Sequence, residues 1–169
     1  MCSVKVSDHW GNLKIGSYNN QSYDPLMPIL QQEFPNWNSK RIKSYMNLVS
    51  QGDSEISGIL AAKNESGYYV GFVIYAFHQI DKGKFNSLEF SEQNETYNVF
   101  VIENINSCIP ILQKQIFLAM VDECIKIANA NNCDYIELPT LNTQSYDLVK
   151  NKYNNQIQDS KSFRTYIKI

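Results

Sequence analysis

The sequence holds few of the residues that build metal sites or nucleophilic triads. It contains 2 histidines and 4 cysteines, and Cys2, Cys108, Cys124 and Cys133 have no CxxC spacing. We therefore expect no bound metal and interpret the cysteines as reduced thiols. No apolar run approaches the length of a membrane span, and residues 1–5 lack the apolar core of a signal peptide. These absences predict a cytoplasmic protein without a membrane partner.

An excess of positive charge is missing as well. The 15 basic and 17 acidic residues give a net charge of −2, and no basic run stands out. Binding to nucleic acid depends on clustered positive charge, so we expect no nucleic-acid partner. The composition, with 43% hydrophobic and 19% charged residues, is typical of a globular protein. The length fits one domain that spans residues 1–169.

Hydrophobic periodicity predicts strands and helices along most of the chain. Strands are expected at residues 12–18, 56–63, 68–78, 97–105, 134–138 and 163–169. Helices are expected from Asp24 to Phe34, from Asn38 or Ser39 to Gly52, from Leu112 to Ala130, and around Tyr146–Tyr153. Asn64–Gly67 is a turn cluster that makes the second and third strands a hairpin, and Gly71 marks a bulge or a close backbone approach. Residues 1–10 have no clear period and are expected to be loosely held or to form a short lead-in.

The chain is organised around residues 97–142. A β-branched and aromatic strand is followed by a helix and then by a second strand, which is the pattern of a right-handed βαβ unit. The helix carries an apolar stripe at three- and four-residue steps, made of Phe117, Met120, Val121, Cys124 and Ala128. A ligand of such a unit binds where the first strand leads into the helix, because free N–H groups and the helix dipole point there.

The order of these elements resembles the GNAT (N-acetyltransferase) superfamily. Gly67–Phe72 looks like the family's hairpin, with a turn followed by a Val-Gly step, and Tyr135–Asn142 looks like its fifth strand ending in an Asn before a helix. The resemblance implies an α/β (α+β) fold with a mixed central sheet of six to seven strands and about four helices. It also implies acetyl-CoA or another acyl-CoA as co-substrate. The pantetheine arm would lie between two splayed central strands, near Glu103–Ile105.

The sequence departs from the family at the pyrophosphate loop. Family members carry a Gln/Arg-x-x-Gly-x-Gly/Ala loop, whereas Ile109–Ala119 contains no glycine and Pro110 removes one N–H donor. If Gln113 opens the motif, Ile116 and Leu118 replace the glycines; if Pro110 opens it, Gln113 and Gln115 do. The chain therefore looks like a divergent member with a degenerate loop. The cofactor-binding candidates that the resemblance implies are Asn104, Ile105, Ile111, Gln113, Lys114, Gln115 and Asn142.

The catalytic candidates are one carboxylate and two tyrosines. Alternation places Glu103 on one strand face with Val99, Val101 and Ile105, and a carboxylate there suits a general base that takes a proton from an attacking amine. Many family members carry a Tyr seven residues past the Asn, where it protonates the leaving thiolate. Val149 stands at that position in this chain. Tyr146 and Tyr153 flank it by one helical turn and are the candidate acids.

Two functional interpretations remain open. In the first, the chain is a GNAT-like N-acyltransferase that moves an acetyl or other acyl group from acyl-CoA directly to a small-molecule or peptide amine. In the alternative, it is a catalytically inactive GNAT-fold binding protein, such as an immunity or regulatory module, with a protein partner. Residues 79–96 and exposed aromatic side chains would then form the partner surface.

Overall fold

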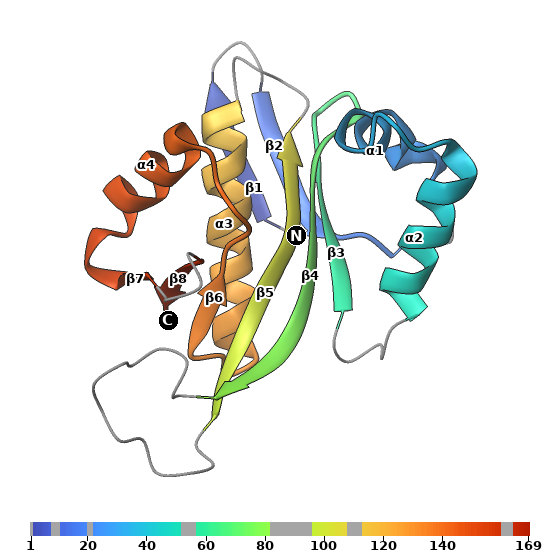
Figure 1. Ribbon diagram of the computed structural model, residues 1–169. Helices are drawn as coiled ribbons and strands as arrows, with labels where there is room; N and C mark the ends of the chain where they lie inside the picture. Colours follow the sequence, from blue (N-terminus) through green and yellow to red (C-terminus); the bar gives the residue numbers. More distant parts are fainter. Residues whose placement is uncertain are drawn as a thin grey trace.

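The computed structural model describes residues 2–7, 11–19, 22–51, 57–81, 96–107, 113–159 and 164–169. These residues form one mixed sheet with helices on both faces (Figure 1). The strands are β1 Cys2–Ser7, β2 Gly11–Ser17, β3 Ser57–Lys63, β4 Tyr69–Asp81, β5 Thr96–Ser107, β6 Tyr135–Glu137, β7 Ile157–Asp159 and β8 Thr165–Lys168. The helices are η1 Asp24–Leu26, α1 Met27–Glu33, α2 Ser39–Gln51, α3 Gln113–Ala130, α4 Thr143–Lys152 and η4 Asn154–Gln156.

The strand order is β1-β2-β3-β4-β5-β6-β8-β7. Among the described residues β5 and β6 form the one parallel pair, and the other neighbours are antiparallel. The mixed sheet and the four α-helices that the resemblance implied are confirmed. The sheet has eight strands because β1 and β7 each add an edge strand that the sequence pattern did not indicate. The expectation that residues 1–10 are loosely held is wrong for Cys2–Ser7, which pairs with β2.

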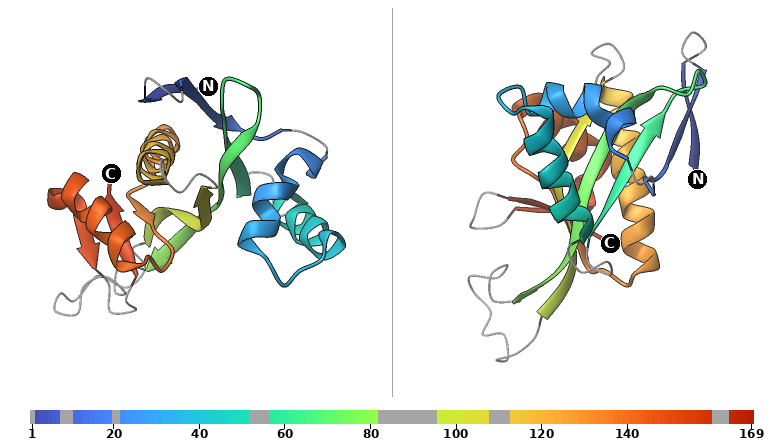
Figure 2. Two further views of the ribbon diagram at one scale, coloured as in Figure 1. Left: turned by 90° about the horizontal axis from the view of Figure 1, so that it is seen from above. Right: turned by 90° about the vertical axis from the view of Figure 1, so that its right-hand side faces the viewer.

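Helices lie on both faces of the sheet (Figure 2), and each face has its own hydrophobic core. The face that we call the α3 face is covered by α3 and α4, whose buried side chains pack on Phe100, Ile102 and Ile136. The opposite face, which we call the α1–α2 face, carries α1 and α2 over β3 and β4. A small aromatic and aliphatic cluster continues this second face over β5, β6 and β8; it consists of Val99, Val101, Tyr135 and Tyr166.

Asparagine side chains begin two of the helices. The backbone N–H of Arg41 donates to Oδ1 of Asn38 at 2.8 Å, and that of Ser145 donates to Oδ1 of Asn142 at 2.8 Å. Each bond satisfies one of the N–H groups that a helix start leaves open. The first predicted helix differs in detail, because Asp24–Leu26 forms a 3-10 turn and the α-helix starts at Met27.

Gly71 marks a close approach of β4 to its neighbours, as the sequence indicated. A Cβ at this position would lie 3.1 Å from the backbone oxygen of Asn106 and 3.1 Å from Sδ of Met120. The adjacent register shift in the β3–β4 pairing, between Ala62 and Lys63, is a second irregularity at this end of the hairpin. The glycine therefore lets α3 pack tightly against β4 and β5. In the part of the chain that the structure describes, no helix is long and apolar enough to cross a membrane.

Candidate active site

The parallel strands β5 and β6 separate after three paired residues. Val99, Phe100 and Val101 face Tyr135, Ile136 and Glu137, where the pairing ends. Beyond that point the backbone N–H of Leu138 donates to the oxygen of Thr165, which ties the chain to the β8 side. Meanwhile β5 continues to Ser107 along β4. The described residues place no strand against the open edge of β5 from Ile102 to Ser107.

A cleft of about 360 Å³ occupies this opening. Its walls are the second half of β5, the segment that leads into α4, the N-terminal parts of α3 and α4, and the end of α1. The lining residues are Glu103–Ser107, Pro139–Asn142, Lys114, Phe117, Met120, Gln144, Ser145, Leu148 and Glu33. Polar and charged side chains therefore meet in an opening between two strands of the sheet.

A second pocket of about 400 Å³ adjoins the first and shares Glu103, Pro139 and Thr140 with it. Its remaining lining residues are His78, Val101, Ile102, Glu137 and Arg164. Val101 and Glu137 point away from α3, because the side chains that alternate with them pack in the core of the α3 face. The second pocket thus opens on the α1–α2 face. Glu103 lies where the two pockets meet.

Glu103 is the extra residue of a β-bulge. In the pairing of β4 with β5, Ile74 faces Asn104 while the next residue, Tyr75, faces Ile102, so Glu103 has no partner. A bulge re-aims one side chain and shifts the alternation beyond it. The prediction that Ile105 shares a face with Val99 and Val101 is therefore wrong, since Ile105 packs in the core of the α3 face. Glu103 is exposed to solvent instead of lying on an apolar face.

The negative charge of Glu103 acts on Tyr45 of α2. The pKa of Tyr45 is raised, first by burial and then by the negative charge of Glu103. Tyr45 in turn packs edge-on against Phe34 and Trp37, with ring centroids 5.6 Å apart in both pairs. These three rings form an aromatic cluster between the end of α1 and the middle of α2.

Sequence reasoning missed Glu33, a second carboxylate in the cleft. Its Oε2 accepts a hydrogen bond of 2.7 Å from Nδ2 of Asn106, and the two residues are 73 positions apart. A signal was present, because Glu33 follows the buried Ile29 and Leu30 by four and three residues and so shares their helix face. An acidic residue at such a position indicates a specific polar contact.

Sequence reasoning also missed Glu137, which is only 5% exposed. One carboxylate oxygen pairs with Arg164, and the other accepts a hydrogen bond of 3.1 Å from the hydroxyl of Tyr166. A buried carboxylate needs such partners because an unpaired charge is costly inside a protein. The pair places a fixed guanidinium at the rim of the second pocket. Alternation along β6 already put Glu137 on the same face as the buried Tyr135.

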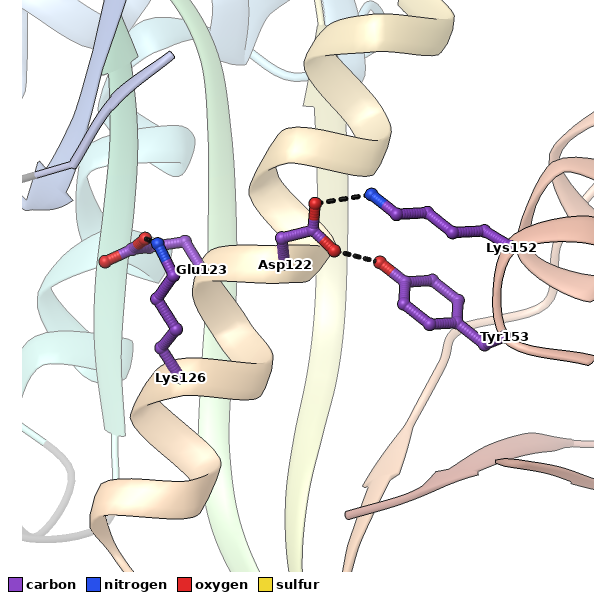
Figure 3. Close-up of polar contacts among 5 residues, drawn as sticks. All are labelled: Asp122, Glu123, Lys126, Lys152 and Tyr153. Carbon is purple, nitrogen blue, oxygen red and sulfur yellow. Dashed lines mark hydrogen bonds and ion pairs between the residues drawn. The ribbon is translucent and has the colours of Figure 1, made fainter. Parts of the chain in front are cut away.

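The two predicted acid tyrosines do not line either pocket. Tyr153 is buried between α3 and α4, where its hydroxyl donates to Asp122, which also pairs with Lys152 (Figure 3). Burial and this hydrogen bond raise the pKa of Tyr153 well above its ordinary value. Tyr146 is half-buried on α4, and the Lys150 ammonium lies 5.8 Å from the centre of its ring. On α4 the cleft is lined by Gln144, Ser145 and Leu148 instead.

The cofactor-binding candidates fall into three groups. Asn104, Ile105, Lys114 and Asn142 line the cleft, whereas Gln115 is exposed on α3 outside its lining. Ile111, the Gln113 side chain and the glycine-free stretch 108–112 lie outside the described residues, as do residues 82–95 of the predicted partner segment. None of the described His, Cys, Asp and Glu side chains form a group of three or more that is placed to hold a metal ion.

The cleft offers several groups to which a polar ligand can bind. Oγ of Ser107, in a residue only 9% exposed, is buried and has no hydrogen-bond partner among the described residues. A buried hydroxyl without a partner costs free energy unless a ligand or water satisfies it. Lys114, in the first turn of α3, adds a positive charge at a helix N-terminus. The residues present therefore fit an extended ligand that carries amide and phosphate groups.

No protein-family model and no curated protein matches the sequence. Solved structures of acetyltransferases, in contrast, share its fold. AAC(6')-Iy, solved in complex with a CoA bisubstrate analogue, is 13% identical, with a TM-score of 0.61 over 82% of this chain and 88% of that one. Aminoglycoside 6'-N-acetyltransferase AAC(6')-Ih from Acinetobacter baumannii is 12% identical, with a TM-score of 0.57 over 83% and 88%.

An acetyltransferase of the GNAT family from Staphylococcus aureus is similar over a larger part of both chains. It is 15% identical, with a TM-score of 0.56 over 92% of this chain and 98% of that one. The resemblance to the GNAT superfamily is thus confirmed at the level of the fold. At these identities the comparison carries the architecture, and the chemistry has to be argued from the residues of this chain.

Proposed function

We propose that this protein is an N-acyltransferase that transfers an acyl group from acyl-CoA directly to an amine. The observation that carries the proposal is the position of Glu103. The opening between β5 and β6 holds the cleft, which reaches from α3 to the end of α1, and the adjoining pocket on the α1–α2 face, and this carboxylate lines both. One pocket can therefore admit an acyl donor and the other an acceptor, with a base at their junction.

The donor would bind in the part of the cleft that α3 lines. The open edge of β5, from Asn104 to Ser107, offers backbone groups and the buried Ser107 hydroxyl to the amides of the pantetheine arm. Lys114 would bind phosphate as a point charge at the start of α3. Asn142 borders the same cleft, although its side-chain oxygen already caps α4. When bound, the donor supplies an activated acyl thioester.

Glu103 would act as the general base on the acceptor. An amine attacks only in its neutral form, so one ammonium proton passes to the carboxylate, directly or through water, before the nitrogen–acyl bond forms. The nitrogen gives up its second proton to solvent once that bond has formed. The carbon–sulfur bond breaks in the same transfer, and the sulfur takes a proton from solvent. We assign this last proton to solvent because no tyrosine among the described residues lines either pocket.

We propose a small-molecule amine as the acceptor. Two of the structurally similar proteins are aminoglycoside acetyltransferases, which gives a precedent for small acceptors in this architecture. The second pocket, at about 400 Å³, lies within the range of small-molecule sites. It is also lined by charged and polar groups from several elements, which suits a polar acceptor more than an apolar one.

Isothermal titration of the purified protein with acetyl-CoA and with CoA tests the proposal first. A ligand that binds only the native state raises its stability by mass action, so a thermal-shift assay must report the same binding. Binding in the micromolar range, followed by acetylation of a primary amine in a mass-spectrometric screen, is the expected result. Absence of binding at millimolar acetyl-CoA would contradict it. That result would favour the alternative, a GNAT-fold protein that binds a protein partner without catalysis.

A further inference from the structure

Helix α2 is basic, although the whole protein has a net charge of −2. It carries Lys40, Arg41 and Lys43 and no acidic residue, even in the first turn, where the helix dipole favours negative charge. Lys43 is paired with Asp24, with 2.6 Å between Nζ and Oδ1. Lys40 and Arg41 are exposed, and neither forms an ion pair with any residue that the structure describes. Two positive charges of α2 are therefore available to a partner.

An aromatic ring holds the Arg41 side chain in place. The guanidinium carbon lies 4.2 Å from the centre of the Trp37 ring, and this ring stacks on Phe34 with 4.7 Å between the ring centroids. A guanidinium that lies against a ring keeps the N–H groups at its edge free to donate. Because the side chain is already ordered, it loses little entropy when a carboxylate binds. Arg41 is thus prepared for a bidentate contact with a carboxylate.

A large apolar side chain lies on the same side of α2. Leu48 is 71% exposed and stands seven residues after Arg41, with Tyr45 between them. Residues at positions i, i+4 and i+7 follow one line along a helix. Helix α2 lies at the periphery of the molecule (Figure 1), so this line faces outward. We call the surface made of Trp37, Arg41, Tyr45 and Leu48 the α2 strip.

The charge of the α2 strip favours a different protein over a second copy of this chain. In a two-fold contact through α2, the same surface of both copies meets, so the cations of one helix would face those of the other. The helix has no carboxylate that could pair with them, and like charges in an interface are unfavourable. The composition suits a protein partner, because tryptophan, tyrosine and arginine contribute most to protein–protein binding.

We infer that the α2 strip binds an acidic segment of a partner protein. One carboxylate of the segment binds the guanidinium of Arg41, a second lies near Lys40, and an apolar side chain packs on Leu48. Seven residues of a helix span about 10.5 Å, which an extended chain covers in about three residues. The segment therefore has two adjacent acidic residues and a large apolar residue about three positions farther on. This inference does not depend on the proposed acyl transfer.

Two peptides of equal length test the inference by NMR titration of the isotope-labelled protein. The peptide acetyl-SEESGLS-amide has two glutamates and a leucine at the required spacing, and acetyl-SQQSGLS-amide has glutamines instead. The acidic peptide should shift the amide signals of α2 in a saturable way, with an affinity at least about fivefold higher than that of the neutral one. High salt should remove this advantage. Absence of a saturable shift in α2, or equal affinity for both peptides, would overturn the inference.

Variants of exposed side chains assign the contacts. Arg41→Gln and Leu48→Gln keep good helix formers and should each weaken binding of the acidic peptide by at least about threefold. Arg41→Lys should weaken it as well, because it keeps the charge but loses the planar donor. Lys168→Gln, which removes an exposed charge on β8, is the matched control. Equal weakening by Lys168→Gln would reduce the effect to net charge and overturn the inference.

Further measurements separate other occupants and the proposed enzyme activity. A uridine oligonucleotide that shifts the α2 signals at lower concentration than the acidic peptide would overturn the inference in favour of nucleic acid. A dimer seen by sedimentation that Leu48→Gln dissociates would overturn it in favour of a second copy. Acetyl-CoA should bind Leu48→Gln and the unmodified protein equally. Peptide binding without acetyl-CoA binding would sustain the α2 strip and reject the proposed transfer; the converse result would reject the strip alone.

Discussion

The hydroxyl of Tyr153 donates a hydrogen bond to the carboxylate of Asp122 and so joins the end of α4 to the middle of α3 (Figure 3). Lys152, one residue earlier, pairs with the other oxygen of the same carboxylate. This arrangement uses the Tyr153 hydroxyl for packing two helices and keeps it away from the cleft.

Replacing Tyr153 by Phe should lower stability and leave catalysis intact. The change removes one hydrogen bond in a buried position, and we expect a loss of about 1 kcal/mol in the free energy of unfolding, measured by urea denaturation. Tyr68→Phe is the control, because that ring is 72% exposed and its hydroxyl lies on the β3–β4 turn. A large fall in kcat for Tyr153→Phe, with a changed pH–rate profile, would restore Tyr153 as the catalytic acid.

Replacing Glu103 by Gln should slow acyl transfer by about a hundredfold, the usual contribution of a general base. The side chain is exposed at a bulge, so stability should change by less than about 0.5 kcal/mol. The defect should shrink as the pH rises, because more of the acceptor amine is then neutral without help from the protein. Turnover of Glu103→Gln equal to that of the unmodified protein at neutral pH would remove this residue from the mechanism.

Replacing Lys114 by Met should weaken CoA binding without affecting a ligand that lacks phosphates. Lys114 is exposed in the first turn of α3, so its charge contributes about 1 kcal/mol, or about fivefold in affinity. Titration with CoA, which carries phosphates, and with S-acetylpantetheine, which carries none, separates an effect on phosphate binding from a general effect on the cleft. Lys126→Met, near the other end of α3, is the matched control. An equal loss for both ligands would assign Lys114 to helix packing instead of phosphate binding.

The hydrophobic pattern was enough to predict most of the fold, because strands and helices with one buried face carry their period in the sequence. It failed where the chain departs from that period. The bulge at Glu103 shifts Ile105 to the α3 face, and no local signal marks where a bulge will form. The edge strand Cys2–Ser7 is held by its pairing with β2, which composition does not encode.

The site was predictable only in part, for a related reason. Glu103, Asn104 and Lys114 lie close to the expected strand and helix ends, so their position followed from the βαβ pattern. Glu33 and Arg164 enter through contacts across long stretches of chain, with Asn106 and with Glu137. Such pairs depend on how α1 and β8 are placed over the sheet, and a single sequence does not show that placement.

Replacing Gly71 by Ala should destabilise the packing of α3 on the sheet. The new Cβ would lie 3.1 Å from the backbone oxygen of Asn106 and from Sδ of the fully buried Met120, so one of them has to move. Overpacking of this kind costs about 1 to 3 kcal/mol. Gly67→Ala is not a suitable control, because φ is +87° at that position. The comparison variant is Ala61→Gly in the neighbouring strand, which removes a methyl group where Gly71→Ala adds one. Unchanged denaturant unfolding of Gly71→Ala would show that Met120 adapts at no cost.

Alkaline pH should destabilise the protein through its buried thiols and phenols. Burial raises the pKa of Cys124 above the ordinary thiol value of 9.0, and Cys133 shifts in the same direction for the same main reason. Above pH 9 the unfolded chain loses these protons while the folded chain keeps them, so the free energy of unfolding falls as the pH rises. Tyr153 and Tyr135 add to the effect above their ordinary value of 10.0.

Thermal unfolding measured between pH 8 and pH 10.5 checks this sign. One such thiol contributes a slope of up to about 1.4 kcal/mol per pH unit above its unfolded pKa. In Cys124→Ala the stability at pH 8 should be lower, because a buried sulfur atom is lost. Its stability should also fall less steeply as the pH rises. The thiol should also resist iodoacetamide at pH 8 in the native protein and react after unfolding in guanidinium, as peptide mapping would show. Stability that stays flat or rises across this range would contradict the burial of these groups.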